Sequence, residues 1–284
     1  MPALDLEAEY NNRTRVPEHP AIQARWSAAA SAFRQTSGGA LDRAYGSRPR
    51  QRYDLFTPKG VDKGAPLVVY IHGGYWQRGE RADNAFVARE LVARGTAVAV
   101  VGYTLCPEAG VMDIVGEIRQ ALKSLWEATK QHPVVVGHSA GGLLAAAMLA
   151  SDWSKVSGVP ADLVRSAYAI SGVFDVAPLV STSLNTAVKL DAATAKAASP
   201  LFWPAPAKDR TFVACVGGDE SQEFIRQSLE ITAVWSRAGV KAECVVVPGT
   251  NHFSVVDELT HPESAMVARL VGMARATAVS AKGA

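Results

Sequence analysis

One short stretch, VVVGHSAGGLLAAAML at residues 134–149, restricts the possible fold more than any other feature of this chain. The valines read as a buried strand, and the alanine- and leucine-rich run reads as a helix. Between them, residues 137–141 match the pattern G-x-S-x-G, in which neither flanking glycine carries a Cβ that would obstruct a sharp strand-to-helix turn. A serine in that turn is presented at the end of a sheet, so we predict that Ser139 is a nucleophile.

Segments of strand and helix character alternate along the rest of the chain. The expected strands are 52–57 (an edge strand), 66–72, 96–103, 132–137, 166–171, 211–218 and 242–249. The expected helices are 21–34, 82–94, 111–130, 140–150, 222–237 and 263–276. This alternation requires right-handed crossovers, so the fold class is α/β, a mostly parallel, doubly wound sheet with helices on both faces.

The chain has no internal repeat and no low-complexity linker, so we expect one domain over residues 1–284. Residues 1–50 form an N-terminal arm ahead of the main fold. Residues 175–208 break the alternation, since they hold four prolines and no clear strand, and we expect a small cap-like insertion over one end of the sheet. That insertion is either a lid or pocket wall, or a long surface excursion.

Composition argues against several kinds of partner. The net charge is +2 and both signs are interspersed, which disfavours a nucleic-acid or anionic-membrane surface and favours small-molecule partners. No run reaches the ~18 apolar residues of a membrane span, and the N-terminus lacks the apolar segment of a leader, so the cytoplasm is the default location. The oligomeric state stays open, a homodimer being one option.

Metal and disulfide chemistry are not indicated. The 3 cysteines are odd in number and widely spaced, and the 6 histidines are scattered with no HExxH pattern. We therefore expect no metal and no other cofactor.

A serine nucleophile needs a base and a group that orients the base, in the chain order Ser, acid, His for this architecture. His252 follows the strand at 242–249, whereas His261 precedes Pro262 at the last helix, so His252 is the expected base. Asp219 follows the strand at 211–218 and is the expected acid. The alternatives for the acid are Glu220, Asp175 and Asp209, whereas Asp257 comes after the base and is set aside.

The oxyanion of a tetrahedral intermediate needs preorganised donors. HGGYW at residues 72–76 leaves a strand as a glycine loop, and its backbone N–H groups can serve, those of Gly74 and Tyr75 with Gly73 nearby. The N–H of Ala140, next to the nucleophile, is the expected partner donor. His72 is best explained as a side chain that holds this loop by hydrogen bonding.

Several segments together resemble one group of enzymes. They are HGGYW, GYTLCPE (102–108), GHSAGG (137–142), ISGVFDVAPL (170–179), ASP (198–200) and GGDESQEFIRQS (217–228). They look like the α/β-hydrolase fold and, more narrowly, the kynurenine formamidase (arylformamidase) group in the hormone-sensitive-lipase-like branch. The resemblance implies hydrolysis of N-formylkynurenine and places Ser139, Asp219 and His252 as nucleophile, acid and base.

Aromatic side chains near strand ends suit a flat aromatic substrate. Trp76, Phe174 and Phe253 each neighbour a catalytic or oxyanion segment and are the expected substrate contacts. The function predicted is a serine hydrolase that removes formyl or short acyl groups from aryl amides or esters through an acyl-enzyme. The alternatives are a general short-chain carboxylesterase and, in another class, a catalytically silent hydrolase fold used as a binding module.

Overall fold

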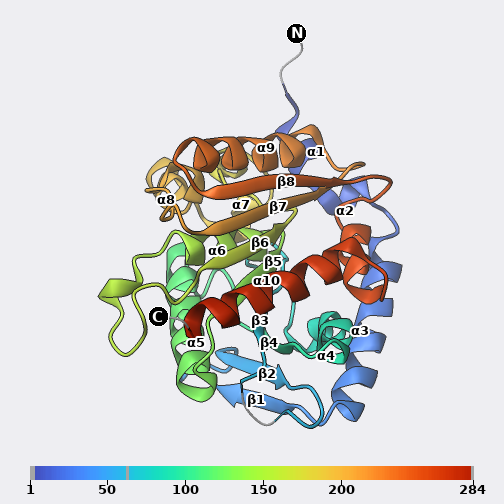
Figure 1. Cartoon of the computed structure of the whole chain (residues 1–284). Helices are drawn as coiled ribbons and strands as arrows, with labels where there is room; N and C mark the ends of the chain where they lie inside the picture. Colours follow the sequence, from blue (N-terminus) through green and yellow to red (C-terminus); the bar gives the residue numbers. More distant parts are fainter. Residues whose placement is uncertain (1–3, 62–63, 283–284) are drawn as a thin grey trace.

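The structure of the chain, a computed structural model, describes residues 4–61 and 64–282. Residues 1–3 of the expected arm and residues 283–284 of the expected domain lie outside the described part, as do residues 62–63. The described residues form an eight-stranded sheet in the order β1-β2-β4-β3-β5-β6-β7-β8 (Figure 1). The strands are β1 (Ala40–Ala44), β2 (Arg52–Phe56), β3 (Leu67–Ile71), β4 (Ala97–Val101), β5 (Pro133–His138), β6 (Ser166–Ile170), β7 (Thr211–Gly217) and β8 (Lys241–Val247).

Strands β3 to β8 run parallel, and β1 and β2 pair in the antiparallel sense at one end of the sheet. The expectation that residues 52–57 form the edge strand is wrong, because β1 lies outside β2. The sequence ALDRA of β1 is largely exposed and lacks an apolar alternation. It forms a strand because its backbone pairs with that of β2, and a search for hydrophobic periodicity does not detect such pairing.

The sheet separates two hydrophobic cores, because successive side chains of a strand point to opposite faces. In β4, Val98 and Val100 enter one core, whereas Ala97, Ala99 and Val101 enter the other. Helices α5 (Val111–Thr129), α6 (Ala140–Leu149) and α9 (Gln222–Arg237) pack on the second face. Helices α3 (His19–Thr36), α4 (Ala88–Ala93) and α10 (Ala265–Lys282) pack on the first. A sheet with both faces covered in this order is the expected α/β-hydrolase fold.

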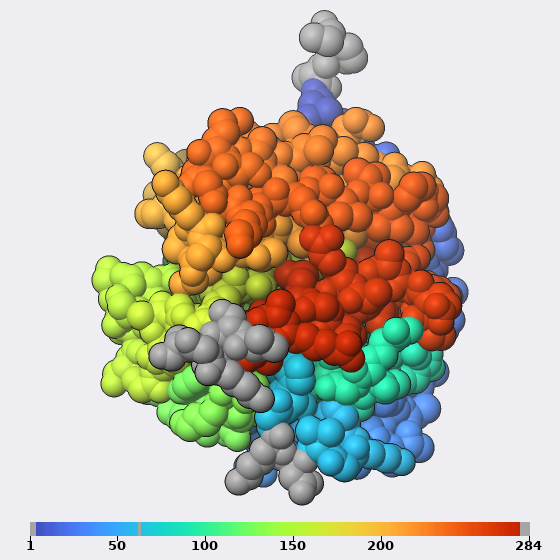
Figure 2. Space-filling model, in the orientation of Figure 1, coloured from blue at the N-terminus to red at the C-terminus, as the bar shows by residue number. Residues whose placement is uncertain are grey.

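Figure 2 shows how completely one face is covered. The side chains of α10, in red, lie against the segment around α4, in teal, and leave the strands beneath them hidden. No helix within residues 4–61 and 64–282 is both long and apolar enough to cross a lipid bilayer.

Helix α4 is shorter than the helix expected at 82–94. Residues Ala82–Val87 form a 3-10 helix, and α4 begins only at Ala88. The side chain of Asn84 donates to the carbonyl oxygen of Glu80 at 2.8 Å. Such a side-chain bond competes with the backbone pairing of a regular α-helix, so the first turn is tighter.

The remaining short helices belong to the arm and to residues 175–208. The arm has α1 (Leu6–Tyr10) and α2 (Asn12–Arg15) before α3. The segment 175–208 has α7 (Asn185–Val188), α8 (Ala192–Ala197) and the 3-10 helices Ala177–Ser181 and Pro200–Phe202, and a further 3-10 helix lies at Trp153–Lys155 and another at Ser254–Thr260. Glu7 of the arm accepts a hydrogen bond from the Ser183 hydroxyl at 2.6 Å, so these two segments touch.

Candidate active site

Ser139 lies in the turn between β5 and α6, in a backbone conformation that few residues adopt. Its φ is 55° and its ψ −118°, and its N–H donates to the carbonyl oxygen of Ile170 at 2.8 Å. A Cβ on Gly137 would lie 1.9 Å from the carbonyl oxygen of Gly141, and one on Gly141 would lie 2.1 Å from that of Ile71. Both glycines are therefore required sterically, and the turn holds Ser139 in a strained but defined position.

The structure corrects the expected acid, because the carboxylate that contacts the imidazole of His252 is that of Glu220. Its Oε2 lies 2.7 Å from Nδ1 of His252. Asp219 is exposed, and its backbone N–H donates to the carbonyl oxygen of Thr250 at 3.0 Å. Consecutive residues in the tight turn after β7 point in opposite directions, so Asp219 faces solvent while Glu220 turns inward.

Glu220 is fully buried and held by other donors as well. Its Oε1 accepts from the backbone N–H of Gly217 at 2.7 Å and from the hydroxyl of Ser171. A buried carboxylate is costly unless its oxygens are paired in this way. The remaining oxygen, Oε2, faces His252, so Glu220 can fix the orientation of that ring and stabilise its protonated form.

His138, the residue before the nucleophile, ties β5 to the loop of His252. Its Nε2 donates to the carbonyl oxygen of His252 at 2.8 Å. Burial, followed by repulsion from His252, lowers the pKa of His138 to about 3, so the ring is neutral and acts as a hydrogen-bond donor. This bond places the His252 loop beside the serine turn.

The loop after β3 approaches the nucleophile closely. A Cβ on Gly73 would lie 3.0 Å from Cβ of Ser139, and Gly74, Tyr75 and Trp76 all have positive φ. Among the described residues, none of the four expected oxyanion donors (the N–H groups of Gly73, Gly74, Tyr75 and Ala140) has a hydrogen-bond acceptor. These N–H groups are therefore available to a ligand.

His72 holds this loop from below. Its Nδ1 donates to the carbonyl oxygen of Gly73 at 2.8 Å, and its own carbonyl accepts from the hydroxyl of Tyr103 at 2.9 Å. Burial lowers the pKa of His72 to about 4, so it remains neutral. These contacts are those of a residue that supports the loop.

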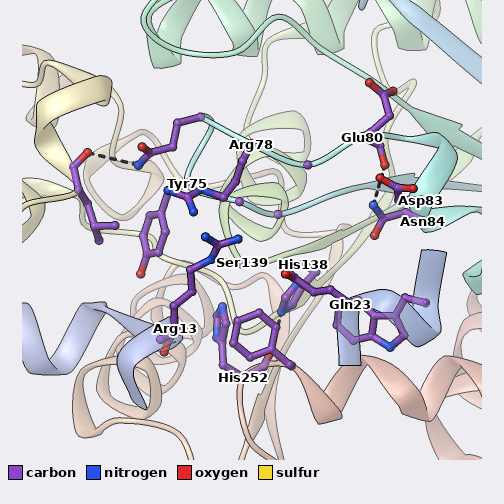
Figure 3. A pocket seen from close by; sticks show the side chains of 18 of the residues that line it. Arg13, Gln23, Tyr75, Arg78, Glu80, Asp83, Asn84, His138, Ser139 and His252 are labelled. Carbon is purple, nitrogen blue, oxygen red and sulfur yellow. Dashed lines mark hydrogen bonds between the residues drawn. The ribbon is translucent and has the colours of Figure 1, made fainter. Parts of the chain in front are cut away.

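Ser139 and His252 line one pocket with a volume of about 690 Å³ (Figure 3). Its wall also includes Gly73, Gly74 and Tyr75 from the loop after β3. The opposite wall comes from the N-terminal arm, and its residues are Asn11, Asn12, Arg13, Thr14, Gln23, Ala24, Trp26 and Ser27. The size is within the range of pockets for small molecules.

The arm residues were not among the predicted site residues. The polar run NNRTR at 11–15 is a signal in the sequence, because it places two amides and two arginines side by side in the arm. Its position over the pocket depends on contacts with distant residues. For example, Tyr75 donates through its hydroxyl to the carbonyl oxygen of Tyr10 at 2.5 Å.

Of the three aromatic residues expected to contact substrate, only Phe253 lines the pocket, where it stacks on His19 with ring centres 5.4 Å apart. Trp76 and Phe174 are completely buried in the core, so the structure contradicts that role for them. Phe174 packs edge-on against Phe212. Large aromatic side chains next to strand ends are as useful for filling the core as for binding ligands.

The chain is similar to known proteins over most of its length. A kynurenine formamidase from Salmo salar is 32% identical over 226 residues, which are 77% of this chain and 76% of that protein. A kynurenine formamidase from Danio rerio is 30% identical over 90% of both chains. The chain belongs to the kynurenine formamidase family. The family model called BD-FAE also matches residues 53–157.

A solved structure shares the fold of this chain over nearly its whole length. A protein from Silicibacter sp., described as a putative thioesterase, is 32% identical and superposes with a TM-score of 0.85 over 94% of this chain and 98% of that one. The chain is thus an enzyme of the α/β-hydrolase class.

Proposed function

We propose that this member of the family is a serine hydrolase that removes formyl groups from aryl amides, with N-formylkynurenine as the type of substrate. One observation supports the proposal most directly: Ser139 and His252 line the same pocket, and the imidazole of His252 is paired with Glu220. The distance from Nδ1 of His252 to Oε2 of Glu220 is 2.7 Å. The names of the relatives from Salmo salar and Danio rerio favour a formyl amide as substrate.

The reaction begins when the hydroxyl of Ser139 attacks the formyl carbon and Nε2 of His252 takes the hydroxyl proton. The hydroxyl has no hydrogen-bond partner among the described residues, and catalytic bonds of this kind often form only once substrate is present. Glu220 stabilises the imidazolium. The N–H groups of the loop after β3 and of Ala140 bind the oxyanion.

The tetrahedral intermediate then collapses. The imidazolium gives its proton to the leaving aryl amine as the carbon–nitrogen bond breaks, which leaves a formyl ester on Ser139. Water replaces the amine, loses a proton to His252 and attacks the ester carbonyl. The second tetrahedral intermediate collapses as its bond to Oγ of Ser139 breaks, and the imidazolium returns its proton to Oγ. Formic acid leaves and ionises to formate, and the free serine and neutral His252 are restored.

The test compares kcat/KM for N-formylkynurenine and formanilide with kcat/KM for phenyl acetate and phenyl butyrate. Efficient cleavage of the formyl amides supports the proposal, whereas cleavage of the esters alone identifies a short-chain carboxylesterase. Ser139→Ala should lower kcat by at least about 10⁴-fold. Ser154→Ala, at an exposed serine outside the pocket, is the matched control and should change nothing.

A fluorophosphonate probe gives a readout that does not depend on the substrate. It should label the wild type and fail to label Ser139→Ala. If the wild type neither reacts with the probe nor hydrolyses any of these substrates, the chain is a binding module and the proposal is wrong.

A further inference from the structure

Two arginines from different parts of the chain line the pocket of Ser139. Arg13 belongs to α2 of the arm, and Arg78 follows the loop that carries Gly74 and Tyr75. Figure 3 shows both side chains extending into the same side of the pocket, near Tyr75 and Ser139. Both residues are exposed to solvent, so a ligand entering the pocket can reach them.

Neither arginine forms an ion pair with any residue in the described part of the chain. The arginines that flank the pocket differ in this respect. Arg25 pairs with Asp257, and Arg50 pairs with Glu80 at 2.9 Å. The positive charge of Arg13 and Arg78 is thus left for a group that the protein does not supply.

The carboxylates that line the pocket are already engaged elsewhere. Glu80 pairs with Arg50 through Oε2 and with Arg81 through Oε1, at 2.9 and 3.0 Å. Asp83 accepts a hydrogen bond from the hydroxyl of Ser27 at 2.7 Å. Neither acid therefore neutralises the two free arginines.

The positive charges of Arg13 and Arg78 repel each other across the pocket. Partial burial, followed by repulsion from Arg78, lowers the pKa of Arg13 below its ordinary value. An anion placed between the two guanidinium groups would relieve that repulsion. A carboxylate also matches their planar arrays of N–H donors, which favour two parallel hydrogen bonds.

Both arginines are attached to ordered backbone. The loop of Arg78 folds back on itself, since the N–H of Gln77 donates to the carbonyl oxygen of Gly74 at 3.1 Å and a Cβ on Gly74 would lie 2.4 Å from the carbonyl oxygen of Arg78. Helix α2 is capped by the side chain of Asn11, which accepts from the N–H of Thr14. The backbone positions of both arginines are therefore fixed relative to the nucleophile, while their side chains stay available to a ligand.

We propose that Arg13 and Arg78 bind a carboxylate on the leaving group of the substrate and make the enzyme selective for acyl amides of aromatic amines that carry such a group. This inference rests on the proposed function, because it assumes that the acyl carbon lies at Ser139. The leaving group then extends from the nucleophile to the arginines across the 690 Å³ pocket. The two residues determine specificity and take no part in bond cleavage.

The test uses two substrates that differ only in this charge, N-formylkynurenine and its α-carboxamide. The wild type should have the higher kcat/KM for the carboxylate. Arg13→Gln and Arg78→Gln should each lower the ratio of the two kcat/KM values about tenfold, mainly through KM, because a charge-assisted hydrogen bond contributes about that factor. Higher ionic strength should lower the ratio in the wild type, since exposed charges are screened.

Arg15→Gln is the matched control. Arg15 lies on the same helix α2, is exposed and has no ion pair among the described residues, but it does not line the pocket. Its replacement should leave the ratio unchanged. The proposal is overturned if the two pocket variants leave the ratio unchanged, or if they weaken both substrates equally.

Calorimetry on Ser139→Ala separates this inference from the proposed function. The inactive protein should bind kynurenine more tightly than kynurenine carboxamide, and Arg13→Gln added to it should remove the difference. If the wild type hydrolyses no formyl amide but this preference persists, the proposed function fails and the anion subsite stands. If formyl amides are hydrolysed without any such preference, the anion subsite fails alone.

Discussion

The two walls of the catalytic pocket are built in different ways. The strand-end wall, defined here as His138, Ser139 and His252, lies at the carboxyl ends of β5 and β8 and is almost inaccessible, with exposed fractions of 7%, 2% and 4%. The arm wall, defined as residues 11–14 together with Gln23, Ala24, Trp26 and Ser27, comes from the segment of the short helix α2 and from the first half of α3, and it includes exposed side chains such as Arg13 and Thr14. The first wall is fixed by the parallel pairing of β5 with β3 and β6 and by the bond from His138 to the loop of His252. The second is fixed by packing of α3 on the core and by polar contacts of the arm with distant residues.

This difference separates chemistry from recognition. Proton transfer requires groups held to within a fraction of an ångström, which strand ends provide. Recognition of a leaving group does not require such exact positioning, so it can be provided by the side chains of the arm and changed by substitutions there. The predictions below test whether the strand-end wall controls turnover and the arm wall controls binding and local stability.

After the loss of Ser139 itself, the largest effect is expected from the acid. Glu220→Gln should lower kcat about 10³-fold or more, because a neutral amide cannot stabilise the imidazolium of His252. Asp219→Asn, at the exposed neighbouring position, should change kcat by less than about twofold. Steady-state kinetics on formanilide checks both. The reverse ranking would return the acid to Asp219 and contradict the hydrogen bond at Nδ1 of His252.

Acid should destabilise the fold through two buried neutral histidines, His138 of the strand-end wall and His72 beneath the loop after β3. The pKa values of His138 and His72 are lowered to about 3 and about 4 from an ordinary value of 6.5. Below pH 6.5 the unfolded chain binds protons that the folded chain does not, so the free energy of unfolding falls as pH falls towards those lowered values. At pH 5 the loss should be about 2 kcal/mol for each histidine.

Urea denaturation between pH 7 and pH 5 measures this loss. His138→Gln keeps a side-chain N–H for the carbonyl of His252 but cannot titrate, so this variant should lose about 2 kcal/mol less than the wild type over this pH range. His261→Gln, at an exposed histidine, should leave the pH dependence as in the wild type. A pH dependence that is unchanged in His138→Gln would mean that His138 is not the neutral donor assigned here.

The sequence predicted the strand-end wall better than the arm wall. The strong apolar periodicity of α9 predicted its bounds to the residue, and the G-x-S-x-G turn predicted where Ser139 lies. The choice of Asp219 over its neighbour Glu220 as the acid was wrong, because it depends on which way a side chain leaves a turn and the sequence does not report that. Nor could the arm be placed, since Tyr10 is fixed by Glu223, 213 residues away. Sequence patterns predict structure over short stretches, whereas the position of the arm wall depends on contacts between residues far apart in the sequence.

The bond between Tyr75 and Tyr10 ties the loop after β3 to the arm, and its loss should have a moderate effect. Tyr75→Phe leaves the buried carbonyl of Tyr10 without this donor and should lower the free energy of unfolding by about 1.5 kcal/mol. KM should rise because the arm is then held less firmly. Denaturant titration should show a lower midpoint with an unchanged slope.

Tyr70→Phe is the control for that change. The hydroxyl of Tyr70 is buried and has no partner among the described residues, so the same chemical change there should be neutral or stabilising. If the free energy of unfolding fell equally in both variants, the cause would be the loss of a buried hydroxyl in general. The bond between Tyr75 and Tyr10 would then not explain the result.

Asn12 provides the smallest expected effect, and one of opposite sign. It lines the pocket from the arm and is 3% exposed, yet neither polar atom of its side chain has a partner within the described residues. A buried amide without partners is costly, so Asn12→Leu, which is similar in size, should raise the free energy of unfolding by about 1 kcal/mol. Differential scanning calorimetry in the absence of substrate measures the change. A lower melting temperature would show that the amide already has a stabilising partner in solution, and Asn12 would then help to hold the arm wall in place.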